Sequence, residues 1–347
     1  MKKPIEMRAF YKRVLSIFEL PPLSQDILTR IMAGSEKAND YEEVLKYDKF
    51  FTEMICKFAS AHMKTSVVTS LGHGVVVVGQ QSVRNMVLGH QISRIFSPHA
   101  DTAFKDLETS GKLVKYGLRA EEFAKKCGNE YTGLAFTAGY IFDIFNGWFE
   151  SDKKMEEKFS PLLDQVWKHG LRAASLAWAL ANHERVFISL RKNVFAAALL
   201  HDIGKLGLAL LAPEDYALAF EKIKTDREIN PSDDSYEAKI EKDYFDLTHQ
   251  EVGSAIIFQS KLLRDLENFL DYHHDSILLK ARHADSFLVA AIINIADRLS
   301  VMTEKKATFT MEELQEVVRP HKDYFPLKAH DVMDLYAILR GKALLAA

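Results

Sequence analysis

Small and apolar side chains recur every three or four positions along most of the chain, which is the spacing of one face of an α-helix. Examples are Leu171, Ala174, Ser175 and Trp178 in one stripe, and Leu262, Leu263, Leu266, Phe269 and Leu270 in another. Long alternating runs of apolar and polar residues, which mark half-buried strands, do not occur. Glycines and prolines are modest in number, at 16 and 9. The pattern predicts an all-α protein.

The first third of the chain continues this pattern with one exception. Helically spaced apolar positions follow the start Leu20-Pro21-Pro22-Leu23, and a second stripe lies between residues 41 and 60. The exception is a run of four valines, Val75 to Val78, because β-branched residues favour strands. This run leads into the sequence Val83-Arg84-Asn85-Met86-Val87-Leu88. The residues alone therefore leave a strand or a helix open here.

Two stretches interrupt the apolar stripes with charged and polar residues, at 150–158 and 224–243. The second contains Asn230-Pro231-Ser232-Asp233-Asp234 and is expected to be an exposed loop, either a solvated insertion or a lid over a site. The tail from residue 308 to residue 347 predicts one or two further amphipathic helices. The first of these holds Met311, Leu314, Val317 and Val318. Docking of the tail on the core and pairing with another chain are both open, so no oligomeric state is assigned.

Charge and composition narrow the range of partners. The chain has 347 residues, long enough to bury a sizeable core, with 45 basic and 48 acidic residues and a net charge of −3. No basic stripe marks a binder of nucleic-acid polymers, although a nucleotide-sized ligand stays open. Cys56 and Cys127 have neither metal-site nor redox spacing, which fits a reducing cytoplasm. We expect neither a membrane span of ~18–20 apolar residues nor a signal peptide.

The chemistry of the chain centres on His201-Asp202, which follows the apolar run 196–200 and precedes Ile203-Gly204-Lys205. A histidine beside a carboxylate offers one nitrogen and one oxygen to the same divalent cation. Further potential ligands flank this pair along the chain. They are His169, His249, the doublet His273-His274 and Asp297.

This order of histidines and aspartates resembles the HD superfamily of metal-dependent phosphohydrolases. The resemblance implies a metal site built from His169, His201, Asp202 and Asp297. It also allows a second metal on His249 and His273 or His274, with Asp202 bridging. The implied cofactors are divalent ions: iron, zinc, manganese or magnesium. Such ions polarise a phosphoryl oxygen and lower the pKa of bound water.

Two residues close to these ligands are candidates for supporting roles. Lys205, three residues after Asp202, could act with Asp202 in catalysis by holding a phosphate as a point charge, or could be an ordinary solvated lysine. Asp275 could orient a ligand histidine. The other histidines are expected to be ordinary surface or core residues. They are His62, His73, His90, His99, His183, His283, His321 and His330.

The N-terminal half resembles HDOD domains, a regulatory offshoot of the HD superfamily in which many members are thought to lack hydrolase activity. The resemblance is carried by the Leu-Pro-Pro-Leu start and by the Leu71-Gly72 and 83–88 segments, and extends from about Leu20 to about Met302. It implies that the valine run is helical.

An internal repeat accompanies these motifs. The sequence 115–120 recurs as 168–173, and Phe136, Ala138, Asp143 and Ile144 align with Phe195, Ala197, Asp202 and Ile203. In the first copy Tyr116 replaces His169 and Phe142 replaces His201, so this copy cannot build the same site. We interpret it as a degenerate HD-like unit, in which Asp143 is not a ligand; chance similarity of two amphipathic helices is the alternative.

Together these observations predict four segments. They are an N-terminal HDOD-type helical region (1–108), a degenerate HD-like repeat (109–150), an HD-type metal-binding helical domain (151–305) and a C-terminal helical tail (306–347).

Two functions stay open at this stage. The first is an HDOD-type signal-transduction protein with a retained metal site and a protein partner. The second is a metal-dependent phosphohydrolase acting on a nucleotide or cyclic nucleotide phosphoester. The His doublet is followed by Asp275-Ser276-Ile277 and not by the Gly-Tyr-Pro of the related HD-GYP phosphodiesterases, which disfavours hydrolysis of cyclic-di-GMP. The sequence slightly favours the regulatory role and leaves catalysis undecided.

Overall fold

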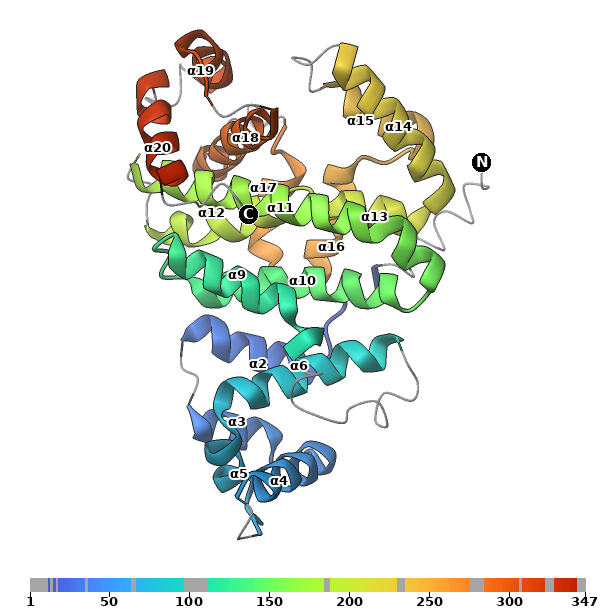
Figure 1. Ribbon diagram of the computed structural model, residues 1–347, viewed down its shortest axis with the longest axis vertical. Coiled ribbons are helices and arrows are strands. Elements are labelled where there is room, and N and C mark those ends of the chain that lie inside the picture. Colours follow the sequence, from blue (N-terminus) through green and yellow to red (C-terminus); the bar gives the residue numbers. More distant parts are fainter. Residues whose placement is uncertain are drawn as a thin grey trace. The chain divides into compact units, whose positions relative to one another are not determined.

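The computed structural model describes residues 12, 15–16, 18–34, 37–63, 67–96, 111–183, 188–229, 235–274, 284–305, 308–321 and 328–341. Every regular element among these residues is a helix (Figure 1). The predicted all-α fold is therefore confirmed. Asp275, His99 and His283 lie outside the described residues.

The chain packs as two compact units. The N-terminal unit comprises residues 20–121 and 131–156, and the C-terminal unit comprises residues 1–19, 122–130 and 157–347. The predicted metal-ligating residues, from His169 to Asp297, all belong to the C-terminal unit.

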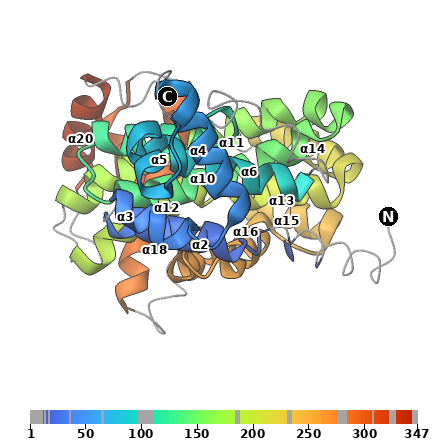
Figure 2. The same cartoon turned by 90° about the horizontal axis from the view of Figure 1, so that it is seen from below.

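The N-terminal unit is a helical bundle in which α10 packs on α2 and α6, and α5 packs on α3 and α4. The α3, α4 and α5 cluster can be followed in Figures 1 and 2. Its helices are α2 (Pro22–Ala33), α3 (Ala38–Leu45), α4 (Lys49–Met63), α5 (Leu71–Val78), α6 (Gln80–Phe96), the first part of α9 (Lys115–Lys126) and α10 (Thr132–Glu150).

The valine run forms a helix, as the family resemblance implies. It makes up the second half of α5, which begins after Ser70, whose hydroxyl accepts the His73 N–H. Gly79, with φ +88°, separates α5 from α6. Val75 is buried and Val76 is exposed, so the valines lie on different faces of the helix. Tertiary packing here overrides the strand propensity.

The C-terminal unit holds the remaining helices. They are α11 (Lys153–His183), α12 (Ile188–Leu200), α13 (Ile203–Leu211), α14 (Pro213–Ile229), α15 (Ser235–Phe245), α16 (His249–Gln259), η1 (Arg264–Leu266), α17 (Glu267–Asp271), α18 (Ala284–Lys305), α19 (Met311–Val318), η3 (Arg319–His321) and α20 (Ala329–Gly341). Helix α18 packs on α12 and α17, and α13 packs on α16. The described part of the tail, residues 308–321 and 328–341, therefore contains two α-helices, and α19 packs on α18 as well as on α20.

The expectation of an exposed loop over residues 224–243 is wrong for its described part. Helix α14 continues to Ile229 and α15 begins at Ser235. Two carboxylates of this stretch, Glu237 and Glu241, are buried. A high density of charged residues indicated solvent exposure, but here some of those charges have partners inside the protein.

The two copies of the internal repeat differ in where a helix is interrupted. In the first copy α10 runs unbroken through Asp143, whose two carboxylate oxygens accept the N–H groups of Tyr116 and Gly117 at 2.8 and 2.9 Å. These N–H groups belong to the first turn of α9, where a helix has no internal acceptors for them. In the second copy α11 runs unbroken through His169, and the interruption falls at His201-Asp202.

Two segments are long and apolar enough to cross a membrane by length and composition alone. They are Leu190–Leu211 and Ser286–Glu304, and 94% and 67% of their most apolar 18-residue stretches are buried. Neither is an uninterrupted apolar run, since Leu190–Leu211 contains Arg191, Asp202 and Lys205, so the expectation that the chain has no membrane span stays a prediction. Because buried core helices pass the same test, these segments are weak evidence for a membrane span.

Replacing Asp143 with Ala leaves the N–H groups of Tyr116 and Gly117 without their acceptor. We expect the free energy of unfolding to fall by about 2–4 kcal/mol, because each buried donor loses its hydrogen bond. Denaturant titration followed by circular dichroism measures this change. Asp143→Asn keeps one acceptor oxygen and should cost less. An Asp143→Ala variant as stable as the wild type would contradict the capping role.

Candidate metal centre

The predicted ligands come together from five places in the C-terminal unit. His169 lies in the middle of α11, the His201-Asp202 pair lies between α12 and α13, and His249 is the first residue of α16. The doublet His273-His274 follows α17, and Asp297 lies in α18. All of these side chains are buried except that of His274, which is partly exposed.

The interruption between α12 and α13 makes the carboxylate of Asp202 available. Asp202 is the N-cap residue of α13, but its side chain makes no capping hydrogen bond. The first turn is closed instead by the backbone, with the Lys205 N–H donating to the Asp202 carbonyl at 3.0 Å. The carboxylate is thus left to face the histidines.

A glycine lets α16 approach this turn. A Cβ atom on Gly204 would lie 1.8 Å from the carbonyl oxygen of His249, so only a residue without a side chain fits between α13 and α16. This close approach places Nε2 of His249 3.6 Å from Oδ1 of Asp202.

One group of ligands surrounds Nε2 of His169. This atom lies 3.2 Å from Nε2 of His201, 2.9 Å from Oδ1 of Asp297 and 3.7 Å from Oδ2 of Asp202. When two imidazole nitrogens each lie about 2.1 Å from one tetrahedral ion, their distance from one another is close to the 3.2 Å found between His169 and His201. His169, His201 and Asp202 each offer a donor atom within 4.8 Å of the others.

A second group consists of His249, His273 and His274, whose donor atoms also lie within 4.8 Å of one another. The Nε2 atoms of all three are buried and have no hydrogen-bond partner in the part of the chain that the structure describes. A buried nitrogen without a partner is costly unless something else binds it. Asp202 faces both groups, with Oδ2 toward His169 and Oδ1 toward His249.

Four of the histidines are held by their other ring nitrogen. Nδ1 lies 2.7 Å from the Ala198 carbonyl in His201, 2.6 Å from the Leu270 carbonyl in His273, 2.8 Å from a Glu241 oxygen in His249 and 3.1 Å from Ser300 Oγ in His169. Such contacts place the proton on Nδ1 and leave the Nε2 lone pair for a cation. The arrangement is that of ligand histidines oriented from outside.

The ionisable groups of the cluster shift one another's pKa values. Burial opposes ionisation of both aspartates, yet Lys205 and the histidines hold the pKa of Asp202 well below its usual value, and hydrogen bonds from His169 and His201 do the same for Asp297. Burial alone would lower the pKa of His169, but hydrogen bonds to Asp297 and Glu304 raise it to about 9. Without a metal, His169 therefore carries a proton that a metal ion would displace.

The pKa values of His273 and His274 are shifted downward, in the opposite direction from that of His169. Burial, aided by the neighbouring histidines, lowers the pKa of His273 well below its usual value. Burial also lowers the pKa of His274 to about 4, although Asp297 opposes this shift. Both imidazoles are neutral at physiological pH, which is the form that binds a metal ion.

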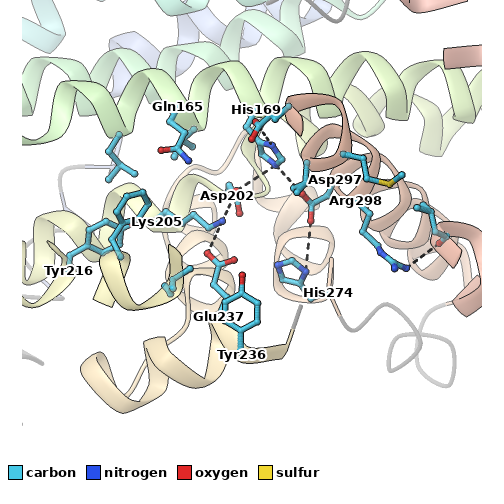
Figure 3. A pocket seen from close by; sticks show the side chains of 18 of the residues that line it. Gln165, His169, Asp202, Lys205, Tyr216, Tyr236, Glu237, His274, Asp297 and Arg298 are labelled. Atoms are coloured by element: carbon cyan, nitrogen blue, oxygen red, sulfur yellow. Dashed lines mark hydrogen bonds and ion pairs between the residues drawn. The ribbon is translucent and has the colours of Figure 1, made fainter. Parts of the chain in front are cut away.

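The predicted catalytic lysine is tied to the cluster by two carboxylates. Nζ of Lys205 lies 2.9 Å from Oδ2 of Asp202 and 3.0 Å from Oε1 of Glu237. Lys205 is therefore not an ordinary solvated side chain; its ammonium group is directed toward the candidate ligands (Figure 3).

The cluster opens on a cavity of about 330 Å³. Figure 3 shows His169, Asp202, Asp297 and His274 around its centre, with Lys205 and Tyr216 on one side. Helices α14 and α15 contribute Tyr216, Phe220, Tyr236 and Glu237 to the wall, and α19 contributes Glu313, Glu316 and Val317. Both the polar stretch expected to be a loop and the tail therefore line the cavity.

Sequence reasoning missed the residues that orient the ligands. Glu241 holds both the backbone N–H and Nδ1 of His249, and Glu237 holds Lys205. Ser300 and Glu304 contact Nδ1 of His169 at 3.1 and 3.6 Å, and Glu304 also pairs with Arg172. The available signal was spacing: Glu237 and Glu241 are four residues apart, as are Ser300 and Glu304, which places each pair on one helix face.

Comparison with known proteins gives the family. A model of the HDOD domain matches the chain twice, over residues 17–164 and 145–276, so the family pattern occurs in both copies of the repeat. No curated protein sequence matches the chain.

Three solved structures are similar to this chain. An HDOD domain protein of unknown function from Geobacter sulfurreducens is 16% identical, with 97% of each chain covered and a TM-score of 0.47. A proposed phosphohydrolase from Shewanella amazonensis SB2B is 12% identical, covering 97% of this chain and 96% of that chain, with a TM-score of 0.49. A proposed signal transduction protein from Marinobacter aquaeolei VT8 is 16% identical, covering 99% of this chain and 64% of that chain, with a TM-score of 0.44. At these scores the structural likenesses carry no argument about function, whereas the sequence model matches well over half of the chain: this protein belongs to the HDOD domain family.

Proposed function

We propose that this HDOD protein is a divalent-metal-dependent phosphohydrolase whose ions are held by the buried cluster of histidines and aspartates. One observation carries the proposal: the cluster lies at the wall of a cavity of about 330 Å³. A structural metal site is closed by its protein ligands, whereas a catalytic site keeps a position open to water and substrate. This favours catalysis over the purely regulatory role toward which the sequence inclined.

The residues fit two cations. His169, His201, Asp202 and Asp297 would hold one, and His249 with His273 or His274 would hold the other. The two oxygens of Asp202 face the two groups separately, which suits a bridging carboxylate. A set so rich in imidazole favours iron, zinc or manganese over magnesium, which prefers oxygen ligands.

Bound cations would lower the pKa of a coordinated water and neutralise a phosphoryl group. The chain's own residues would then complete the site. Lys205 supplies a positive charge beside Asp202, where it can bind a phosphoryl oxygen. Glu237 keeps the lysine in place. A nucleotide or cyclic nucleotide phosphoester is the substrate class.

A non-catalytic regulatory role is the second candidate. The family and the first copy of the repeat favour it, because that copy keeps the helical frame while its Asp143 caps a helix. In this role the metal would tie helices together, since metal-binding free energy is also folding free energy, and the helical surface would bind a signalling protein.

The metal content of the purified protein tests the site itself. Protein made without added metal or chelator should contain about one or two equivalents of iron, zinc or manganese by elemental analysis. The double variant His201→Ala, Asp202→Ala should lose it, because it removes ligands of both groups. His330→Ala, an exposed histidine outside the cluster, is the control and should keep the metal. A wild type that stays metal-free after anaerobic reconstitution would sink the hydrolase proposal.

Metal-loaded protein separates the two candidate functions. We expect it to release inorganic phosphate from a panel of phosphomonoesters, and the double variant to release none. Loaded wild type that is inert across the panel would leave the regulatory role as the better account.

Glu241→Gln tests the orientation of His249. The amide cannot stabilise an Nδ1–H as a carboxylate does, so we expect the second ion to bind about 10–100-fold more weakly. Competition with a chelator measures this affinity. Glu251→Gln is the control, because Glu251 belongs to the cap of α16 and pairs with Lys242 outside the cluster. Equal metal affinity in Glu241→Gln and wild type would show that Glu241 is not needed to orient the ligand.

A further inference from the structure

Helix α15 is fixed to the site at two points. Near its beginning Glu237 binds Lys205, and one turn later Glu241 binds the backbone and ring of His249. These two contacts hold the start of α15 on either side of Asp202, because Lys205 and His249 both contact that aspartate. The backbone next to Glu237 is therefore held at the wall of the cavity.

The residue before Glu237 is Tyr236. It lines the same cavity as Asp202, Lys205 and His274, and it is partly exposed. Figure 3 shows its hydroxyl end directed toward the centre of the cavity, between Glu237 and His274 in that view. A phenol at this place can donate a hydrogen bond to a bound ligand.

Three other donors that line the cavity have contacts of their own. Lys205 is bound by two carboxylates, and Arg298 extends to α19, where it donates to the carbonyls of Glu316 and Val317 at 3.3 Å each. Tyr216 is buried in an aromatic stack, with its ring centroid 6.2 Å from those of both Phe220 and Phe245. The hydroxyl end of Tyr236 is directed toward the cavity, where a departing substrate oxygen could take its proton.

We propose that Tyr236 is a catalytic residue that protonates the leaving oxygen of the substrate, and that the substrate is a small alkyl phosphomonoester. This inference rests on the proposed hydrolase function. The oxygen of water bonds to phosphorus, the bond between phosphorus and the alcohol oxygen breaks, and that oxygen takes the phenolic proton. The proton lost by the water restores the phenol, so the products are one alcohol and one hydrogen phosphate.

The substrate class follows from the basicity of the leaving group. A phenol, with a pKa of about 10, can protonate a departing alkoxide, which is far more basic. An anhydride or aryl leaving group is a weaker base and needs little such help. A cavity of about 330 Å³ is at the lower end of the range for small-molecule sites, which favours one sugar or nucleoside unit over a dinucleotide.

The test compares two substrates on the metal-loaded full chain. The probes are β-glycerophosphate, an alkyl ester, and p-nitrophenyl phosphate, which has a weakly basic leaving group. For Tyr236→Phe we expect kcat to fall by about 10²–10³-fold on the alkyl ester and by less than about tenfold on the aryl ester. Tyr244→Phe is the matched control, since Tyr244 is on the same helix but lies beside Phe245 and Lys222 and not at the cavity.

The outcomes distinguish the role of Tyr236 from the proposed hydrolase function. Equal losses on both substrates, or a wild type that hydrolyses only the aryl ester, would overturn the role of Tyr236 while leaving the hydrolase intact. A loaded wild type that hydrolyses neither ester would defeat the proposed function and this inference with it. Metal content and melting temperature of the Phe variant show whether a loss comes from chemistry or from folding.

Discussion

The C-terminal unit is organised around a buried cluster of histidines and aspartates. Two aspartates and four histidines are at most 8% exposed, and nearly every outward-facing nitrogen is held by a carbonyl, a hydroxyl or a carboxylate. Burial of unpaired charge is costly, so the surrounding helices must supply these contacts. Three features meet this requirement: the interruption before α13, the glycine between α13 and α16, and the carboxylates of α15.

The repeat shows how a small change of backbone decides the use of a carboxylate. Asp143 and Asp202 occupy equivalent places in the two copies. Where the helix runs on, as at Asp143, both oxygens bind the first N–H groups of α9. Where it is interrupted, as at Asp202, the backbone closes its own turn and the oxygens face imidazoles. The apolar frame is shared, so the position of the break separates a helix cap from a candidate metal ligand.

The helical fold could be predicted from the spacing of apolar residues, and the candidate ligands from the order of histidines and aspartates along the chain. The residues that hold the candidate ligands could not be predicted from the sequence. Glu237 and Glu241 stand in a polar stretch that predicted a loop, since a polarity pattern does not tell a solvated carboxylate from one buried against His249. Likewise, the contribution of α19 to the cavity depends on long-range packing through Arg298.

The candidate ligands and the walls of the cavity therefore bear on different questions, the ligands on the metal and the walls on the substrate. The candidate ligands come from α11, the α12–α13 turn, α16, α18 and the segment after α17, and the proposed divalent ion rests on them. The walls of the cavity come from α14, α15 and α19, which supply aromatic and acidic groups. The proposed metal depends on the candidate ligands, whereas the fit of a substrate would depend on the walls. Under the proposed hydrolase function, the substrate class is therefore better inferred from Tyr236 and its neighbours than from the His-Asp pair.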